Sequence, residues 1–306
     1  MRRINYGNLS FLLTMLLAAA WYISGLWADG ASHTIWAVVS AALLPLASAT
    51  IIYLTDERIT SGASGLAPIL WFVLATASPA ALSFTPLHAA TLLLAGALAL
   101  LLVYTCISQG IGILSLSFVL LASASLMIPP MVWLAPVFIA ASAGKSTDKA
   151  KYFTTALISL AAPLFVLCCI RYLLKDAEAV GLTLSEFGTG AITLHPLSIG
   201  ATAPTIARMA VAAVITLLAI VHVAGRLGSY TTVQFHSYLR ILVLMPFFLV
   251  FAVLFLGGQP YEMVTAMPAA LLIDEYAGQS GKKRLTALLL TILALLLAAE
   301  RIFYYI

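Results

Sequence analysis

An uncharged stretch from Gly110 to Ala143 constrains the fold of this chain more than any other feature. At about 1.5 Å per helical residue, it is too long for one crossing of a roughly 30 Å hydrocarbon core and short for two. Pro129 and Pro130 lie near its middle. A helix must break or bend sharply there, because proline lacks the backbone N–H donor and restricts the residue before it. The stretch therefore predicts two short helices that meet at a Pro-Pro apex.

The composition of the whole chain predicts a membrane protein without a sizeable soluble domain. Hydrophobic residues make up 63% and charged residues 8% of the 306 residues, whereas an average soluble domain has roughly 25% charged residues. The mean hydropathy is +1.09. We therefore expect residues 1–306 to form a single all-α integral membrane domain, a polytopic helix bundle of about ten or eleven membrane segments.

The basic residues predict how the chain is oriented. Arg2 and Arg3 precede the first apolar run, and a basic cluster spans Lys145 to Lys151. Cytoplasmic loops carry an excess of Lys and Arg, so both places are expected in the cytoplasm. Apolar runs at 9–28, 34–54, 66–84 and 88–107 supply the crossings that precede the uncharged stretch. Parity then requires residues 110–143 to cross an even number of times, or to dip into the membrane and return.

The second half of the chain alternates apolar runs with polar connections. Membrane helices are expected at 152–174, 205–223, 241–256 and 285–305, with a short or re-entrant piece near 259–273. The segment 175–204 is rich in Gly, Ser and Thr, which predicts a long loop on the outer face. We expect a multi-pass protein of the bacterial inner membrane, with a cytoplasmic N-terminus and a periplasmic C-terminus.

Three arginines lie on the outer side in this topology, against the charge rule. Arg171, Arg208 and Arg301 fall near the outer ends of their predicted helices and share one depth. Guanidinium groups bind phosphate well because the planar fork contacts two oxygens at once. The arginines are therefore candidates for binding the phosphate of a lipid-linked substrate. The alternative is that each one reaches the head groups, or pairs with a carboxylate such as Glu300, Glu262 or Asp29.

Carboxylates on the outer side are the candidates for catalysis. Glu262 follows a Gly-Gly-Gln-Pro break at the start of a short segment, and Glu300 precedes Arg301. Either carboxylate is a candidate to orient a substrate or to accept a proton, with interfacial anchoring as the alternative for Glu262. Asp29 is expected to be part of an ordinary Asp-Gly turn. No metal-binding motif or nucleotide fingerprint is present in the sequence, so no cofactor is expected.

Two stretches of the chain resemble an uncharacterised family of bacterial polytopic inner-membrane proteins, a domain of unknown function. The first is the sequence GIGILSLSFVLLASASLMIPPMVWLAPVFIAASA with the KYFTTALISLAAPLF that follows, and the second is MPAALLIDEYAGQSGKKRLTALLLTILALLL. The arrangement also looks distantly like lipid-linked glycan polymerases and GT-C transferases. This likeness implies many unequal helices around a carrier-lipid cavity. None of those enzymes' catalytic motifs carries over residue by residue.

The leading hypothesis is a protein of envelope biogenesis that binds an isoprenoid phosphate or another anionic lipid-linked substrate at its outer face. One alternative is a non-catalytic subunit of a larger membrane assembly, with a protein partner. Another is a transporter of lipids or small molecules. Membrane lipid is the expected partner. Nucleic acid is not, because the basic residues are scattered instead of lying on one face. The residues do not decide whether the chain is an enzyme.

Overall fold

The computed structural model describes residues 66–75, 86–106, 110–143, 149–174, 177–193, 203–255, 262–279 and 283–305. All regular structure in these ranges is helical, without a strand, as predicted. Four described helices are long and apolar enough to cross a membrane, at residues 89–106, 149–174, 206–229 and 232–255. They suit a multi-pass membrane protein. The predicted helices at 9–28 and 34–54 lie outside the described residues.

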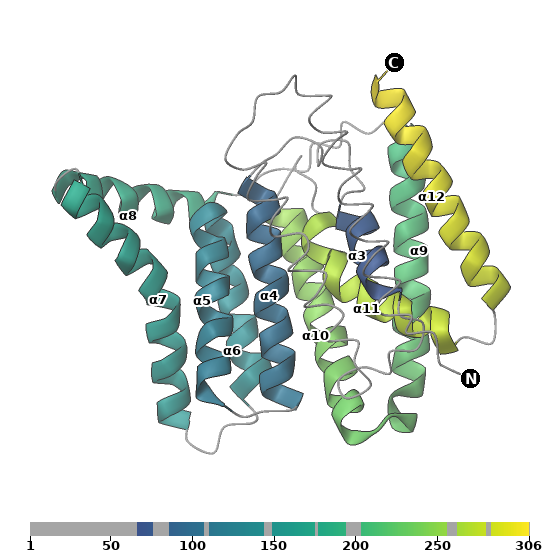
Figure 1. Cartoon of the computed structure of the whole chain (residues 1–306), viewed down its shortest axis with the longest axis horizontal. Coiled ribbons are helices and arrows are strands. Elements are labelled where there is room, and N and C mark those ends of the chain that lie inside the picture. The colour runs from purple at the N-terminus through teal and green to yellow at the C-terminus, as the bar shows by residue number, and fades with distance from the viewer. Residues whose placement is uncertain are drawn as a thin grey trace, which may run out of the picture.

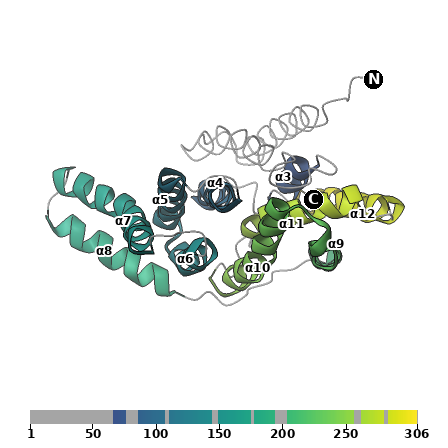
Figure 2. The ribbon, with the colours of Figure 1, turned by 90° about the horizontal axis from the view of Figure 1, so that it is seen from below.

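The helices form two groups that meet at α10 (Thr232–Phe255). Figures 1 and 2 show α4 (Pro86–Cys106), α5 (Ile111–Met127), α6 (Ala135–Ala143), α7 (Lys149–Leu174) and α8 (Ala177–Ile192) on one side. On the other side lie α3 (Ala67–Ala75), α9 (Ala203–Arg226), α11 (Glu262–Gln279) and α12 (Lys283–Tyr305). The short 3-10 helix η3 (Leu227–Ser229) joins α9 to α10.

The uncharged stretch breaks at the prolines, as its sequence predicts. Helix α5 ends at Met127, the 3-10 helix η2 covers Pro129–Leu134, and α6 follows. Before the prolines, Ile128 has φ −129° and ψ 88°, outside the helical region, because the proline ring disfavours that region for its predecessor. The stretch begins and ends at the same end of the molecule, the lower one in Figure 1. The stretch therefore returns to the end at which it starts, which agrees with the even number of crossings predicted from the basic residues on either side.

The prediction of a loop over residues 175–204 is wrong for its first half, where α8 forms. Its Gly, Ser and Thr content suggested a loop, but these residues adapt to the helix. Thr189 donates its hydroxyl to the carbonyl of Ser185, at 2.8 Å, so the polar group is satisfied within the helix. Val180, Leu184, Phe187 and Ala191 recur at helical spacing. This periodicity indicates α8, although the Gly, Ser and Thr content of the segment suggests a loop.

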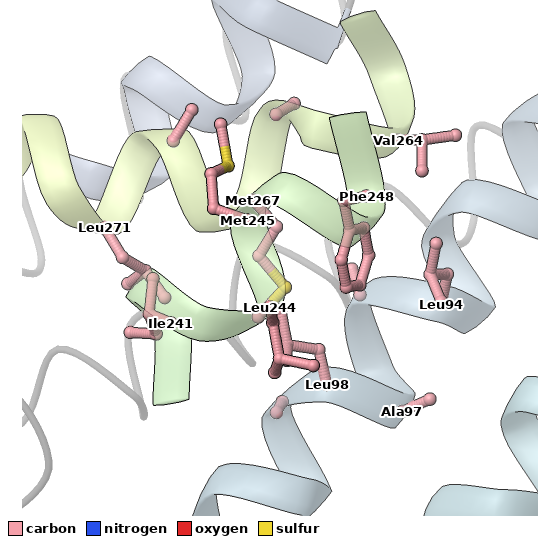
Figure 3. Packing of buried hydrophobic residues seen from close by; sticks show 14 of the residues in the cluster. Leu94, Ala97, Leu98, Ile241, Leu244, Met245, Phe248, Val264, Met267 and Leu271 are labelled. Atoms are coloured by element: carbon pink, nitrogen blue, oxygen red, sulfur yellow. The ribbon is translucent and has the colours of Figure 1, made fainter. Parts of the chain in front are cut away.

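Helix α11 is deeply enclosed within its helix group. Every residue from Ala266 to Tyr276 is buried. It packs between α3, α9 and α10, where Met267 of α11 lies near Phe248 of α10 and Leu271 of α11 lies near Ile241 of α10 (Figure 3). Its small side chains Ala266, Ala269 and Ala270 recur at helical spacing and let neighbouring helices approach closely. The sequence places a short membrane piece here, and the structure makes it the centre of one helix group.

Candidate functional site

An apolar groove lies between α9, α10, α11 and α12. Its volume is about 520 Å³, within the range of small-molecule sites. Most of its lining is aliphatic, and includes Met209, Leu242, Met245, Leu293 and Leu297. Such walls suit the hydrocarbon part of a ligand better than a polar metabolite.

Arg208 is the charged side chain among the described residues that line this groove. It is 2% exposed, although it lies only a turn and a half from the start of α9. A buried guanidinium is costly unless an anion or several acceptors face it. Arg208 also has an interaction within the protein. A guanidinium carries five N–H donors, so one side chain can serve a protein partner and an anionic group together. We call this cavity the Arg208 groove.

Two residues that line the Arg208 groove are exposed on the surface of the protein. Leu217 of α9 is 61% exposed and Leu249 of α10 is 48% exposed, and both line the groove. The α9 segment 206–229 and all of α10 are candidate membrane spans, so their exposed apolar surfaces are the ones that a bilayer covers. Thr216 also lines the groove, and its hydroxyl donates to the carbonyl of Ala212 within α9 at 2.8 Å. An apolar chain can therefore enter sideways while a charged end reaches Arg208.

No known protein family, curated protein or solved structure matches this chain. The groove and the residues around it therefore carry the functional argument alone.

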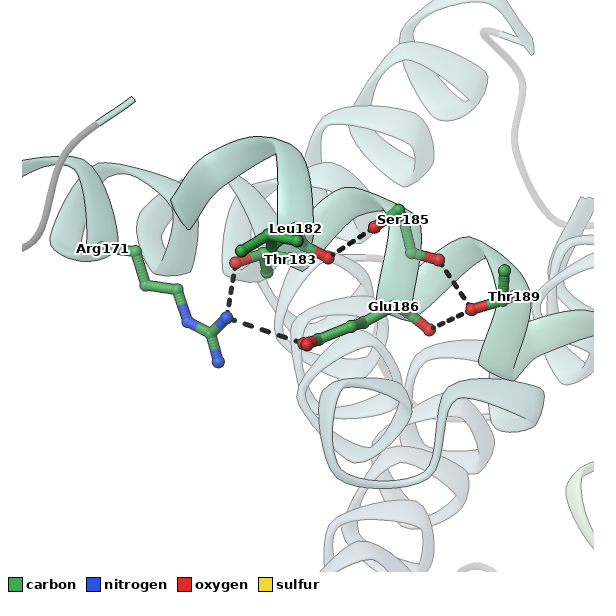
Figure 4. A network of polar contacts seen from close by, with 6 residues as sticks. All are labelled: Arg171, Leu182, Thr183, Ser185, Glu186 and Thr189. Atoms are coloured by element: carbon green, nitrogen blue, oxygen red, sulfur yellow. Dashed lines mark hydrogen bonds and ion pairs between the residues drawn. The ribbon is translucent and has the colours of Figure 1, made fainter. Parts of the chain in front are cut away.

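Arg171 belongs to a different part of the molecule. Its guanidinium donates to the hydroxyl of Thr183 at 2.7 Å and forms an ion pair with Glu186 at 3.7 Å (Figure 4). Figures 1 and 2 place α7 and α8 at one end of the molecule and α9 at the other, with α4, α5 and α10 between them. The structure therefore does not bring Arg171 to Arg208. Equal depth in a membrane says nothing about lateral position, which is why the sequence suggested one cluster.

The side chains of Arg301, Glu262 and Glu300 lie outside the described residues. Their backbone positions are described. Arg301 follows Leu297 by about one helical turn on α12, and Glu262 precedes Thr265 by about one turn on α11. Leu297 and Thr265 both line the Arg208 groove. The structure therefore brings the helix turns that carry two predicted site residues close to the groove that contains Arg208.

Two buried carboxylates on α11 lie just beyond the short membrane piece that the sequence predicts near 259–273. Asp274 is 3% exposed and Glu275 is 1% exposed. Asp274 Oδ1 accepts a 2.7 Å hydrogen bond from the backbone N–H of Leu66, just before α3. Hydrogen bonds from Tyr230 and Tyr238 reach the two carboxylate oxygens of Glu275. Only the continuation of an apolar run into Asp-Glu-Tyr, without Gly or Pro, hinted that the helix extends this far.

The surroundings of Glu275 alter its titration. Burial is the largest effect and raises the pKa of Glu275, while the hydrogen bonds from Tyr238 and Tyr230 and the charge of Arg226 act to lower it. Burial and the neighbouring carboxylate raise the pKa of Tyr230, so its hydroxyl stays protonated and remains a donor. This cluster ties η3 and α10 to α11.

Other polar groups in the core do not form a recognisable reaction centre. His222 of α9 packs its ring edge against Tyr276, with 5.4 Å between the ring centroids. Its buried Nε2 and the buried indole nitrogen of Trp71 have no hydrogen-bond partner in the part of the chain that the structure describes. Among the described residues, no group of three or more His, Cys, Asp or Glu side chains is arranged to hold a metal ion.

Proposed function

We propose that this chain is a multi-pass protein of the bacterial inner membrane, active in envelope biogenesis, that binds an isoprenoid phosphate or another anionic lipid-linked substrate in the Arg208 groove. The observation that carries the proposal is a buried guanidinium in a groove of about 520 Å³ with aliphatic walls. An amphiphile with a phosphate head and a hydrocarbon chain matches both features.

The lining residues would bind the two parts of the ligand separately, the phosphate at Arg208 and the hydrocarbon chain at the aliphatic residues. Arg208 would hold phosphate oxygens through its planar fork, as an anion-binding arginine does. The chain of the ligand would lie against the aliphatic residues of α9, α10 and α12 and leave between Leu217 and Leu249. Arg301 would add a second positive charge near the head group, and Glu262 or Glu300 would orient it or accept a proton. Arg171, paired with Glu186, is not required for binding in this arrangement.

The orientation of the protein follows from its basic residues. The start of α7, with Lys149 and Lys151, and the end of α9, with Arg226, lie at the lower end in Figure 1. The positive-inside rule assigns that end to the cytoplasm. Arg208, near the opposite end of α9, would then bind a head group in the outer half of the membrane.

Native mass spectrometry tests the proposal with a polyprenyl monophosphate as the ligand and the neutral polyprenol of equal length as the comparison. The wild-type protein should retain the phosphate in preference to the alcohol. Arg208→Gln should lower retention of the phosphate by about ten-fold or more, since a charge-assisted hydrogen bond contributes about 1.5–3 kcal/mol. Arg171→Gln is the matched arginine control and should bind as the wild type does.

A second pair of variants tests the groove without touching a charge. Ala212→Phe places a large ring in the groove and should block both ligands, because Ala212 lines it. Ala210→Phe adds the same ring to an exposed position on α9 that is not part of the lining. If Arg208→Gln and Ala212→Phe remain folded by size-exclusion chromatography and still bind the phosphate at wild-type level, the proposal is wrong. Equal losses in Arg171→Gln and Arg208→Gln would instead favour a common effect on the whole bundle.

A further inference from the structure

Helix α8 differs in direction from the helices beside it. Figure 1 shows α4 and α5 standing upright, while α8 runs at a steep angle to them, at the level of the upper end of α5, and contacts α7 and η2. Its 16 residues follow directly on α7, a candidate membrane span. At 1.5 Å per residue, α8 is about 24 Å long, too short to cross a roughly 30 Å hydrocarbon core.

The surface of α7 leads continuously into α8. Leu173 and Leu174, the last residues of α7, are 81% and 77% exposed. In a spanning helix, such side chains face lipid. Two aromatic side chains mark the depth at which α7 ends, since Tyr172 is 60% exposed and Trp133 of η2 is 51% exposed. Tyr and Trp are enriched where a bilayer meets water, because their rings are apolar and their tips polar.

The two long faces of α8 have opposite character. Val180, Leu184 and Phe187 follow one another at helical spacing along one face, where Leu184 is 49% exposed and Val180 and Phe187 are half-buried. Glu178, Ser185, Glu186 and Thr189 share the other face, and all are exposed. Leu182 interrupts this polar face. An amphipathic helix that belongs to no crossing suits a position in the membrane interface, with its apolar face toward the acyl chains.

Several contacts fix α8 in place over the Pro-Pro apex. The indole N–H of Trp133 donates a 2.8 Å hydrogen bond to the carbonyl of Ala191, near the end of α8. A Cβ built on Gly190 would lie 3.1 Å from the ring of Pro129. Nearer the middle of α8, Arg171 of α7 donates a hydrogen bond to Thr183 (Figure 4). The helix is thereby attached to η2 near its end and to α7 near its middle.

We infer that α8 lies in the plane of the membrane surface, with the Val180, Leu184 and Phe187 face against the acyl chains and the Glu178, Ser185 and Thr189 face in the head-group and water layer. Its partner is the lipid surface itself. Since α8 contains two glutamates and no basic residue, its attachment rests on apolar area and on the protein contacts, and not on attraction to anionic lipid. This inference does not depend on what the Arg208 groove binds.

Nitroxide accessibility measured on the full chain tests this placement. The protein, with Cys106, Cys168 and Cys169 replaced by alanine, would be reconstituted in phosphatidylethanolamine–phosphatidylglycerol vesicles. Single spin labels would be attached at Val180→Cys and Leu184→Cys on one face, and at Ser185→Cys and Thr189→Cys on the other. Leu157→Cys on α7, where the side chain is 62% exposed, is the lipid-facing reference.

The expected result is a pattern with helical periodicity. Labels at positions 180 and 184 should collide mainly with oxygen, as the label on α7 does, and labels at 185 and 189 mainly with a water-soluble nickel chelate. High salt should leave the pattern unchanged. Equal access of the chelate to all four positions would place α8 in water and overturn the inference. Equal access of oxygen alone would place it inside the bilayer, which would overturn the inference as well.

Discussion

The hydroxyl of Tyr238 donates a 2.6 Å hydrogen bond to Oε2 of Glu275, a side chain that is 1% exposed. Tyr230 donates to Oε1 of the same carboxylate at 2.9 Å, and the two tyrosine rings lie 4.8 Å apart. Both oxygens of a deeply buried carboxylate thus accept hydrogen bonds, one from Tyr230 just after η3 and one from Tyr238 of α10. This arrangement fixes the second half of α11 against the start of α10, close in sequence to Arg226 at the end of α9.

Replacing Tyr238 by phenylalanine should destabilise the protein. The substitution removes one donor from a buried carboxylate and leaves the ring in place, so we expect a loss of about 1–3 kcal/mol in the free energy of unfolding. Thermal unfolding in mild detergent measures it. Tyr172→Phe, at an exposed position, is the control and should leave the Tm unchanged. An unchanged Tm in Tyr238→Phe would show that this hydrogen bond is not needed to satisfy Glu275.

The pH dependence of stability should report on Glu275, which lies beyond the four candidate spans. Its pKa in the folded protein is raised above the ordinary value of 4.5, chiefly by burial. The folded state therefore binds more protons than the unfolded state, and the stabilising effect is complete below the ordinary pKa and is lost as pH rises through the folded pKa. Glu275→Gln does not titrate, so its Tm relative to wild type should be higher at about pH 8 than at about pH 5. A difference independent of pH would contradict this.

Asp274 should matter for the start of α3. Its carboxylate accepts the backbone N–H of Leu66 at 2.7 Å, one of the N–H groups near a helix start that have no partner within the helix. Asp274→Leu removes the acceptor and should cost about 1–3 kcal/mol, with faster hydrogen exchange in residues 67–70. Asp274→Asn keeps an acceptor oxygen and should cost less. Equal effects of the two substitutions would mean that packing, and not the hydrogen bond, is what Asp274 contributes.

Two glycines of α8 provide a matched test of its packing. Gly188 has nothing within 4 Å of an added Cβ, whereas at Gly190 that atom would lie 3.1 Å from the Pro129 ring. Gly188→Ala should stabilise the protein by about 0.5–1 kcal/mol through helix propensity. Gly190→Ala has the same propensity gain but must push the proline ring away, so its Tm should be clearly lower than that of Gly188→Ala. Identical Tm values would indicate that α8 does not press on the apex.

The sequence predicted the helical class and the break in the uncharged stretch because both follow from local chemistry. Apolar runs without charge determine where a chain is helical in a membrane, and Pro129-Pro130 determine where a helix must end. The basic residues, through parity, also predicted that residues 110–143 return to their starting side. These features depend on composition and on neighbours along the chain, and they needed no knowledge of which helices touch.

The location of polar groups within the bundle could not be obtained in this way. Asp274 and Glu275 follow the short membrane piece predicted near 259–273, yet they are buried and accept hydrogen bonds from the backbone of Leu66 and from two tyrosines in another part of the chain. The sequence predicts a loop at 175–204, yet part of it forms α8, which accepts hydrogen bonds from Trp133 and Arg171. In each case, the partner lies elsewhere in the sequence, so no window along the chain contains the interaction.

The helical class and the place of the Pro-Pro apex follow from the sequence alone. The sequence also predicts one membrane depth for Arg171, Arg208 and Arg301, since depth follows from distance along a helix. Lateral position is a property of the tertiary structure, because it depends on which faces of the helices pack together. Packing separates Arg171, paired with Glu186, from Arg208, and surrounds Arg208 with the aliphatic walls of four helices. One of three equivalent arginines thereby becomes the centre of the candidate site.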